Sequence, residues 1–245
     1  MRKSAIPLRI ACDLDGTLAD MDSALEAEAE RLFGPGIDLR GSLRGRPEGP
    51  ASVESPDPTG STPGIRPPSQ PATTGARLSD RQQRQLWTHV QATRNFWESL
   101  REIEPGTVAR LALVAAARNW DVLFITTRPS STGDTTQIQS QRWLKAHGFD
   151  LPSVFVVFGS RGRVASALTL DAVIDDRPEN CLDVATDSDA TPYLVWRDTP
   201  DSVPEGAARL GIRVVSSVAE ALQQLDSPPV APRGVMGRLR GTLGI

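Results

Sequence analysis

Two aspartates two residues apart stand at the end of a short apolar run near the start of the chain. The run covers residues 10–12, and the sequence DLDGTL follows at residues 13–18. It is predicted to be a buried strand whose carboxyl end carries Asp13 and Asp15, where open α/β sheets bind ligands. One carboxylate of such a pair can attack a substrate while the other transfers the proton. The pair therefore indicates an enzyme that acts on phosphate groups.

Three further groups of polar residues lie at the ends or starts of predicted elements. They are Thr126 and Thr127 after the apolar run 122–125, Arg161 and Arg163 at the start of a short helix, and Asp175 and Asp176 after the run 172–174. The carboxyl ends of parallel strands share one edge of a sheet. The groups that follow strands, namely Asp13 with Asp15, Thr126 with Thr127, and Asp175 with Asp176, are therefore expected to converge there.

The residue types suit a phosphate site with a metal ion. Asp13 and Asp175 offer the hard oxygen ligands that Mg²⁺ prefers. The ion would offset the repulsion between the acids and allow an anionic carboxylate to approach an anionic phosphate. A threonine hydroxyl and backbone N–H groups can hold phosphate oxygens, and a fixed cation can offset the charge that develops during transfer.

Together these groups resemble the four sequence motifs of the haloacid dehalogenase (HAD) superfamily. The resemblance implies a Rossmann-like core and a phospho-aspartate mechanism, with Asp13 as the nucleophile. Asp15 would protonate the leaving group and then activate water. Mg²⁺ would be held by Asp13, the Asp15 carbonyl and Asp175, with Asp176 supporting the metal shell.

The same resemblance assigns the phosphate-binding residues. Thr126 best matches the phosphate-binding threonine of the family, and Thr127 is the alternative one residue later. The third motif normally carries lysine, whereas this chain has arginine at Arg161, with Arg163 as the alternative position. Arginine keeps the charge but is planar and bulkier than lysine. The change bears on turnover rate more than on phosphate binding.

Within the superfamily the chain is most similar to the 5′(3′)-deoxyribonucleotidase type. The similar stretches are residues 13–20, residues 96–100 before the Glu-Pro-Gly at 104–106, and residues 174–180. The resemblance implies hydrolysis of nucleoside 5′-monophosphates. Two alternatives remain: a phosphatase of nucleic-acid ends or sugar phosphates, and a non-catalytic phosphate-binding or interaction protein.

Several residues allow a structural role as well as a functional one. A calcium loop of the EF type that began at Asp13 would need glutamate where the chain has Ala24, which excludes that alternative. Arg128 is predicted to be a structural ion-pair partner. Cys12 is predicted to pack in the core beneath the site, and Asp175-Asp176 could also cap a helix before Pro178.

Several aromatic and histidine residues also allow a structural as well as a functional role. Trp87, Phe96 and Trp97 could stack on a nucleobase, but their helical spacing favours core packing. His89 and His147 are too isolated in sequence to indicate a zinc site.

The elements that must position these residues alternate between strands and helices. Strands are predicted at residues 10–13, 122–125, 154–158, 172–174, 193–196 and 212–215, and helices at 20–33, 78–100, 108–118, 135–147, 164–168 and 218–225. This alternation predicts an α/β fold, a Rossmann-like three-layer parallel sheet with a small helical cap.

Four parts are predicted along the chain. Residues 1–19 and 105–226 form the HAD-like catalytic core, and residues 20–33 and 78–104 form the cap. Residues 34–77 hold nine of the 20 prolines and no aromatic residue, so they are predicted to be a disordered insertion. Residues 227–245 are predicted to be a disordered tail.

Bulk composition limits the range of partners. The chain has 245 residues, is 39% hydrophobic and carries a formal net charge of −3, so no broad nucleic-acid surface is expected. Two cysteines favour a reducing compartment over a disulfide scaffold, and no secretory signal or membrane span is recognised. A cytoplasmic enzyme with a small phosphorylated substrate is expected. The sequence does not indicate an oligomeric state.

Overall fold

Six parallel strands form one sheet in the order β3-β2-β1-β4-β5-β6. The computed structural model describes residues 7–37, 39 and 77–226. The strands are β1 (Arg9–Asp13), β2 (Asp121–Thr126), β3 (Ser153–Val156), β4 (Ala172–Asp175), β5 (Thr191–Val195) and β6 (Arg213–Val215). The order runs outward in both directions from β1 and β4, as in Rossmann-like doubly wound folds. The predicted α/β class is therefore confirmed.

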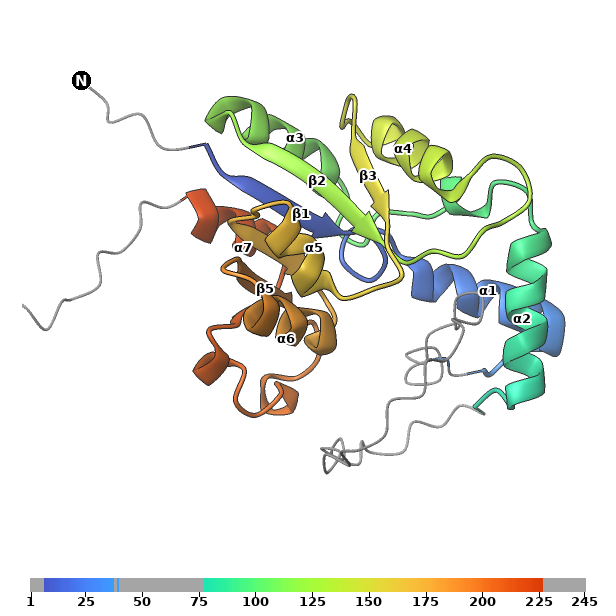
Figure 1. The fold of residues 1–245 in the computed structure, drawn as a ribbon. Coiled ribbons are helices and arrows are strands. Elements are labelled where there is room, and N and C mark those ends of the chain that lie inside the picture. The colour runs from blue at the N-terminus through green and yellow to red at the C-terminus, as the bar shows by residue number, and fades with distance from the viewer. Residues whose placement is uncertain (1–6, 38, 40–76, 227–245) are drawn as a thin grey trace, which may run out of the picture.

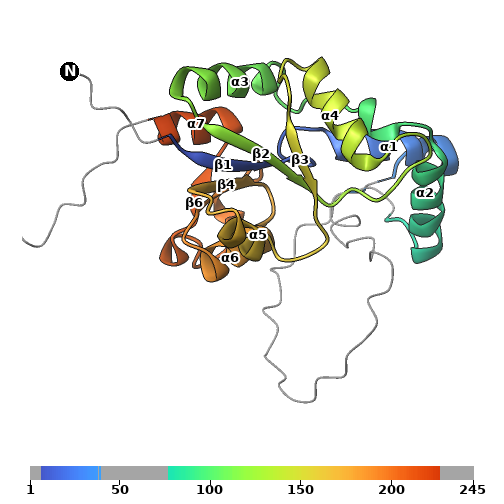
Figure 2. The ribbon, with the colours of Figure 1, turned by 45° about the horizontal axis from the view of Figure 1, so that its top comes forward.

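Helices cover both faces of the sheet. They are α1 (Met21–Phe33), α2 (Asp80–Ala92), α3 (Thr107–Arg118), α4 (Thr136–Ala146), α5 (Arg161–Ala167), α6 (Pro178–Asp187) and α7 (Val218–Asp226), with short 3₁₀ turns η1 (Phe96–Glu98), η2 (Pro200–Ser202) and η3 (Ala208–Leu210). Helices α3, α4 and α7 lie on one face, and α5 and α6 lie on the other (Figures 1 and 2). The sheet is thus the middle of three layers.

The central strand β1 supplies apolar side chains to both layers. Ile10 and Cys12 belong to the larger core cluster with residues of α3, α4 and α7, whereas Ala11 packs in a second cluster with residues of α5 and α6. Successive side chains of a strand point to opposite faces, which explains this division. All three residues are fully buried, as expected of a parallel strand covered on both sides.

Helices α1 and α2 stand beyond the carboxyl end of the sheet and pack against each other (Figure 1). Leu25 of α1 and Leu86 of α2 are fully buried in the larger core cluster. Ser79 caps α2: its hydroxyl accepts from Gln82 N, and Gln82 returns a side-chain bond to the Ser79 backbone. That this pair forms a small helical cap stays a prediction.

The predicted helix 78–100 is wrong in its second half. Helix α2 ends at Ala92, and the chain turns through Asn95, which adopts a left-handed conformation with φ of 50°. Asn95 N donates to Thr132 O at 2.8 Å, and its side-chain oxygen accepts from Asp134 N at 3.0 Å. These contacts with the loop after β2 end the helix, and no helical periodicity could have indicated them.

Residues 96–100, which were predicted to belong to the cap, run along α4. Trp97 N donates to the side chain of Gln139 at 3.2 Å, and Trp143 Nε1 donates to Leu100 O at 2.7 Å. Contacts with α4 therefore hold this stretch in place.

Other boundaries differ by smaller amounts. The strand expected at 154–158 ends at Val156. Helix α6 is absent from the predicted helices, and the sequence indicated it only as a possible helix cap before Pro178, which occupies its first turn. Leu39, inside the predicted insertion, is 3% exposed and packs in the larger core cluster. The rest of that insertion beyond residues 34–37 and 77, and the predicted tail, lie outside the described residues. None of the described helices is long and apolar enough to cross a membrane.

Candidate active site

The carboxyl ends of the two central strands and β2 lie side by side. Strand β1 pairs with β2 on one side and with β4 on the other, and Asp13 is in register with Ile125 of β2. Asp175 is the last residue of β4. The fold therefore brings Asp13, Thr126 and Asp175 to one edge of the sheet, where the sequence predicted them to meet.

Arg161 is the cation next to Asp13. It is 3% exposed and occupies the first turn of α5, which Ser160 caps by accepting from Arg163 N. Arg161 Nη2 donates to Asp13 Oδ1 at 3.1 Å and to Thr127 Oγ1 at 2.9 Å, and Nε lies 3.9 Å from Asp175 Oδ2. A single guanidinium thus contacts groups that follow three different strands.

Two nitrogen atoms of this guanidinium lack acceptors. Within the described part of the chain, Arg161 Nε and Nη1 are buried and have no hydrogen-bond partner. Leaving a buried charged donor unpaired is costly, so such groups are normally satisfied by an acceptor. A phosphate presents several anionic oxygens that suit an arginine fork. The arrangement therefore favours an anion at this position.

The acids around Arg161 repel one another in a buried setting. Burial raises the pKa of Asp13 well above its ordinary value, and the Asp175 carboxylate raises it further, while Arg161 lowers it. Burial also raises the pKa of Asp175, and burial with the Asp175 charge raises the pKa of Asp176 to about 7. One arginine among three acids leaves an excess of negative charge that a further cation would offset.

Asp15 has different neighbours. Arg128 Nε and Nη2 donate to its carboxylate at 2.7–2.9 Å, and Thr126 Oγ1 donates to Oδ2 at 3.1 Å. Arg128 is 2% exposed and also donates to Ser140 Oγ at 3.0 Å. The prediction of Arg128 as an ion-pair partner is confirmed, and its partner is Asp15, the second aspartate of the DLDGTL stretch.

The two threonines at the end of β2 therefore differ in position. Thr126 is fully buried and its hydroxyl is used by Asp15, whereas Thr127 is partly buried and its hydroxyl accepts from Arg161. Thr127 also lines the cleft beside Arg161. The alternative threonine, rather than the preferred Thr126, thus lies where a phosphate would contact Arg161. Arg163 is exposed on α5, and no side-chain contact to the site is found for it among the described residues.

Three residues that the sequence did not single out shape the site. Gly16 has φ of +85°, and a Cβ atom there would overlap the Asp176 carboxylate, 2.7 Å from its Cγ. Thr17 Oγ1 donates to Asp176 Oδ1 at 3.1 Å, and Asn180 Nδ2 donates to both oxygens of Asp175 at 2.9 and 3.1 Å. Their positions within the DLDGTL and DDRPEN stretches were the available signal.

The aromatic residues considered for base stacking lie in the core. Phe96 is 3% exposed and Trp97 fully buried, the two rings meet edge to face, and Arg128 lies over the Trp97 ring at 5.1 Å. Trp87 is partly buried against the same cluster. Cys12 is fully buried as predicted, and burial with the Asp13 charge raises the pKa of its thiol.

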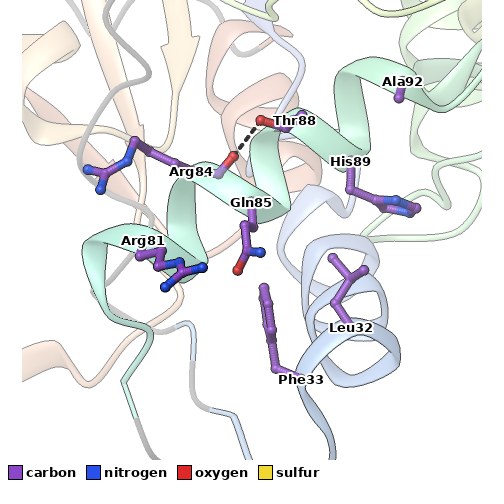
Figure 3. Close-up of a pocket in the computed structure, with 8 residues that line it drawn as sticks. All are labelled: Leu32, Phe33, Arg81, Arg84, Gln85, Thr88, His89 and Ala92. Atoms are coloured by element: carbon purple, nitrogen blue, oxygen red, sulfur yellow. Dashed lines mark hydrogen bonds between the residues drawn. The ribbon is translucent and has the colours of Figure 1, made fainter.

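Two cavities lie near these elements. A cleft of about 290 Å³ opens beside Arg161, and its lining residues are Thr127, Gly159, Ser160, Arg161, Arg177, Glu179, Asn180 and Asp183. A larger groove of about 570 Å³ lies between the end of α1 and α2, with Phe33 facing Gln85 and with Arg81 and Arg84 at its rim (Figure 3). The larger groove contains none of the motif residues, so the cleft beside Arg161 is the candidate substrate entrance.

The donor set suits Mg²⁺ on chemical grounds. No group of three or more His, Cys, Asp or Glu side chains in the described ranges is arranged to hold a metal ion. Mg²⁺, however, is commonly held by one or two carboxylates together with water and substrate phosphate. The carboxylates of Asp13 and Asp175 meet that requirement. Burial raises the pKa of both, and the Asp175 charge raises that of Asp13 further, so a divalent ion would favour their charged forms.

Comparisons with known proteins give distant structural likenesses. No family model matches the chain, and no curated protein matches it. A hydrolase from Pseudomonas syringae is 19% identical, with 89% of this chain and 97% of that chain covered and a TM-score of 0.48. A Thermotoga maritima protein assigned as a β-phosphoglucomutase is 18% identical, with 89% and 98% covered and a TM-score of 0.49.

A third structure is a haloacid dehalogenase-like family hydrolase from Xanthomonas campestris. It is 17% identical, with 90% of this chain and 96% of that chain covered and a TM-score of 0.43. At these identities and TM-scores the likenesses do not bear on activity. The fold class rests on the strand order, and the site rests on its own contacts.

Proposed function

We propose that the chain is a phosphatase of the HAD superfamily that hydrolyses phosphate monoesters through a phospho-aspartate at Asp13. The observation that carries the proposal is the buried Arg161 guanidinium, which contacts Asp13 and Thr127 and has two nitrogen atoms without an acceptor among the described residues. A phosphate bound there would place its phosphorus beside the Asp13 carboxylate. Arg161 and the Thr127 hydroxyl would hold its non-bridging oxygens.

The reaction would take place in two displacements. An Asp13 oxygen attacks phosphorus, the bond from phosphorus to the ester oxygen breaks, and Asp15 gives its proton to the leaving alcohol. Asp15 then takes a proton from water, whose oxygen attacks the same phosphorus, and the bond to Asp13 breaks to release inorganic phosphate. Arg161 offsets the charge on the phosphoryl oxygens in both steps.

Arg128 bears on the role proposed for Asp15. Because Arg128 binds both oxygens of that carboxylate, proton transfer by Asp15 is proposed to involve rotation of one oxygen away from the arginine. The Thr126 hydroxyl supports the resting orientation. Arg128 and Thr126 are therefore proposed to orient the acid/base, rather than to bind phosphate.

Mg²⁺ is proposed as the cofactor. Asp13 and Asp175 would hold the ion, with the Asp15 carbonyl as the further ligand that the family resemblance implies. When bound, the ion would neutralise the acids and the substrate phosphate. Asn180 and the Arg177 backbone N–H, which donates to Asp175 at 2.8 Å, orient the Asp175 carboxylate.

Nucleoside 5′-monophosphates remain the proposed substrates on the family resemblance. The structure also favours a second class, because the cleft beside Arg161 has no aromatic lining among the described residues and Phe96 and Trp97 are buried. A polar cleft of this kind suits a hydroxyl-rich leaving group, such as that of a sugar phosphate. Phosphorylated ends of nucleic acids are a third candidate class of substrate.

A phosphate-release screen tests the proposal. Purified protein with Mg²⁺ is given nucleoside 5′-monophosphates, sugar phosphates, p-nitrophenyl phosphate and oligonucleotides phosphorylated at either end. Release is expected from at least one class, and Asp13→Asn should abolish it while Asp121→Asn, an Asp-to-Asn change at the opposite end of β2, should not. No release across the panel together with no trapping of beryllium fluoride on Asp13 would refute the proposal. Trapping without turnover would instead indicate a phosphate-binding protein.

A further inference from the structure

Arg197, two residues after β5, joins three distant segments near the candidate site. Its Nη1 donates to Gly16 O at 2.7 Å, and its Nη2 donates to Thr17 O at 3.0 Å and to Glu104 Oε1 at 2.7 Å. The Arg197 and Glu104 side chains are 29% and 27% exposed, so the ion pair is largely shielded from water. None of the sequence motifs contains Arg197.

The first segment is the turn that follows the nucleophile strand. Gly16 N donates to Ala19 O, and the N–H groups of Leu18 and Ala19 both donate to Leu14 O at 2.7–2.8 Å. The carbonyls of Gly16 and Thr17 are the groups that Arg197 binds. Arginine binds two carbonyls at once through its planar fork, which fixes the orientation of both peptide groups.

The opposite side of the Gly16–Thr17 dipeptide contacts the Asp176 carboxylate. The Cα atom of Gly16 lies against the Asp176 carboxylate, and Thr17 Oγ1 donates to Asp176 Oδ1. Gly16 and Thr17 are thus held between Asp176 and Arg197. A displacement on the Arg197 side would move the contacts to Asp176 and the backbone next to Asp15.

Glu104 belongs to the segment that returns from the helical pair α1 and α2. Asp20 N donates to Arg101 O at 2.8 Å, and Ile103 N donates to Leu18 O at 2.9 Å, so the outgoing and returning chains are paired. The Arg197–Glu104 ion pair connects this paired base to the end of β5. One arginine therefore contacts both the turn and the base of the helical pair.

We infer that Arg197 is a positioning residue, which holds the turn after Asp15 in register with Asp176 and couples that turn to the base of α1 and α2. It touches none of the groups proposed to react, so its effect on catalysis rests on the proposed function. Displacements near 1 Å in a positioned site can reduce the rate of the chemical step about a hundredfold. The predicted consequence of losing Arg197 is therefore a lower kcat, with smaller changes in substrate binding.

Kinetics of Arg197 variants with p-nitrophenyl phosphate and Mg²⁺ test this inference. Arg197→Met should lower kcat roughly ten- to a hundredfold and change KM by less than about threefold. Arg197→Lys, which keeps a charged donor, should recover part of the loss. Glu104→Gln should have a smaller effect that is not additive with Arg197→Met. The matched control is Arg213→Met, which removes an arginine bonded to the Tyr193 hydroxyl at the other end of the sheet and should leave kcat unchanged.

Hydrogen–deuterium exchange gives a second readout that does not require activity. Arg197→Met should speed exchange in peptides covering residues 14–19 and 101–104, whereas Arg213→Met should not. Localised faster exchange in the variant would uphold the positioning role even if the substrate panel and beryllium fluoride trapping refuted the proposed function. Unchanged kcat and exchange in Arg197→Met, or faster exchange throughout the sheet with a general loss of stability, would overturn the inference.

Discussion

At the scale of single residues, two neighbouring threonines at the end of β2 have hydroxyl groups with different hydrogen-bond partners. Thr126 and Thr127 are adjacent, yet Thr126 donates to Asp15 and Thr127 accepts from Arg161. Successive side chains near the end of a strand point to opposite sides, so an error of one residue exchanges the two partners. The sequence could narrow the phosphate-binding threonine to these two, and only the contacts distinguish them.

The close contact between Gly16 and the Asp176 carboxylate can be tested by substitution. Gly16→Ala should destabilise the protein by about 3 kcal/mol or more, because the new Cβ overlaps the Asp176 carboxylate and the positive φ adds strain. Gly206 has a similar φ of +89° with no atom within 4 Å of the point that a Cβ would occupy, so Gly206→Ala should cost about 1–2 kcal/mol. Urea denaturation of both variants measures the difference. Equal losses would mean that the turn does not contact Asp176 as described.

Variants of Arg161 can test whether phosphate binding needs its positive charge or its planar fork. Arg161→Met should weaken binding of inorganic phosphate roughly ten- to a hundredfold, the equivalent of about 1.5–3 kcal/mol for a charge-assisted hydrogen bond. Arg161→Lys should retain affinity within about tenfold, because the positive charge remains. Calorimetry in the presence of Mg²⁺ measures both, with the exposed Arg163→Met as control. A lysine variant as weak as the methionine variant would show that the arginine fork, and not its charge, is required.

At the scale of elements, local signals located most helices and strands within a few residues. Ser79, Thr135 and Ser160 each precede a helix and accept a hydrogen bond from its first turn, as N-cap residues do. The predicted helix 78–100 fails because Asn95 is drawn into a left-handed turn by residues 132–134. That partner segment is far from Asn95 in sequence, so no local pattern records it.

The start of α7 supplies a prediction about pH. The backbone N–H and the hydroxyl of Ser216 both donate to Glu220 Oε2 at 2.8 Å, and they lower the pKa of Glu220. A lowered folded-state pKa stabilises the fold above the unfolded pKa of about 4.3, and this contribution is lost as pH falls through the folded value. Glu220→Gln should therefore be less stable than wild type at pH values about two units above that pKa, with the difference shrinking as the carboxylate is protonated. Chemical denaturation across this range measures it, and a difference that is constant with pH would contradict the bonded carboxylate.

At the scale of the whole molecule, strand order decides which charges meet. Strands β1 and β4 are far apart in sequence yet pair directly, which places Asp13 next to Asp175 and Arg161 between them. Burying several acids together with a single cation opposes folding. A divalent ion bound by the folded state alone would stabilise the entire chain by mass action.

Thermal unfolding with and without Mg²⁺ tests this balance. At about one hundred times its Kd, Mg²⁺ should stabilise the protein by about 2.7 kcal/mol and raise Tm by about 5 °C or more. Asp175→Asn should remove most of the rise, because it takes away a carboxylate ligand. Asp121→Asn should keep the rise in Tm, because Asp121 pairs with Arg9 at the start of β2, away from the candidate site. Equal shifts in all three proteins would place Mg²⁺ elsewhere.

The amino-acid sequence by itself determined the parallel α/β class, the strand-end positions of Asp13, Asp15 and Asp175, and the arginine at position 161. These features follow from local hydrophobicity, turn residues and residue identity. Only the tertiary structure decided which donor meets which acceptor: Arg128 with Asp15, Thr127 with Arg161, and Arg197 with the Gly16 and Thr17 carbonyls. Each of these contacts depends on the register between strands and on side-chain direction. Those are properties of the assembled sheet and not of any one segment.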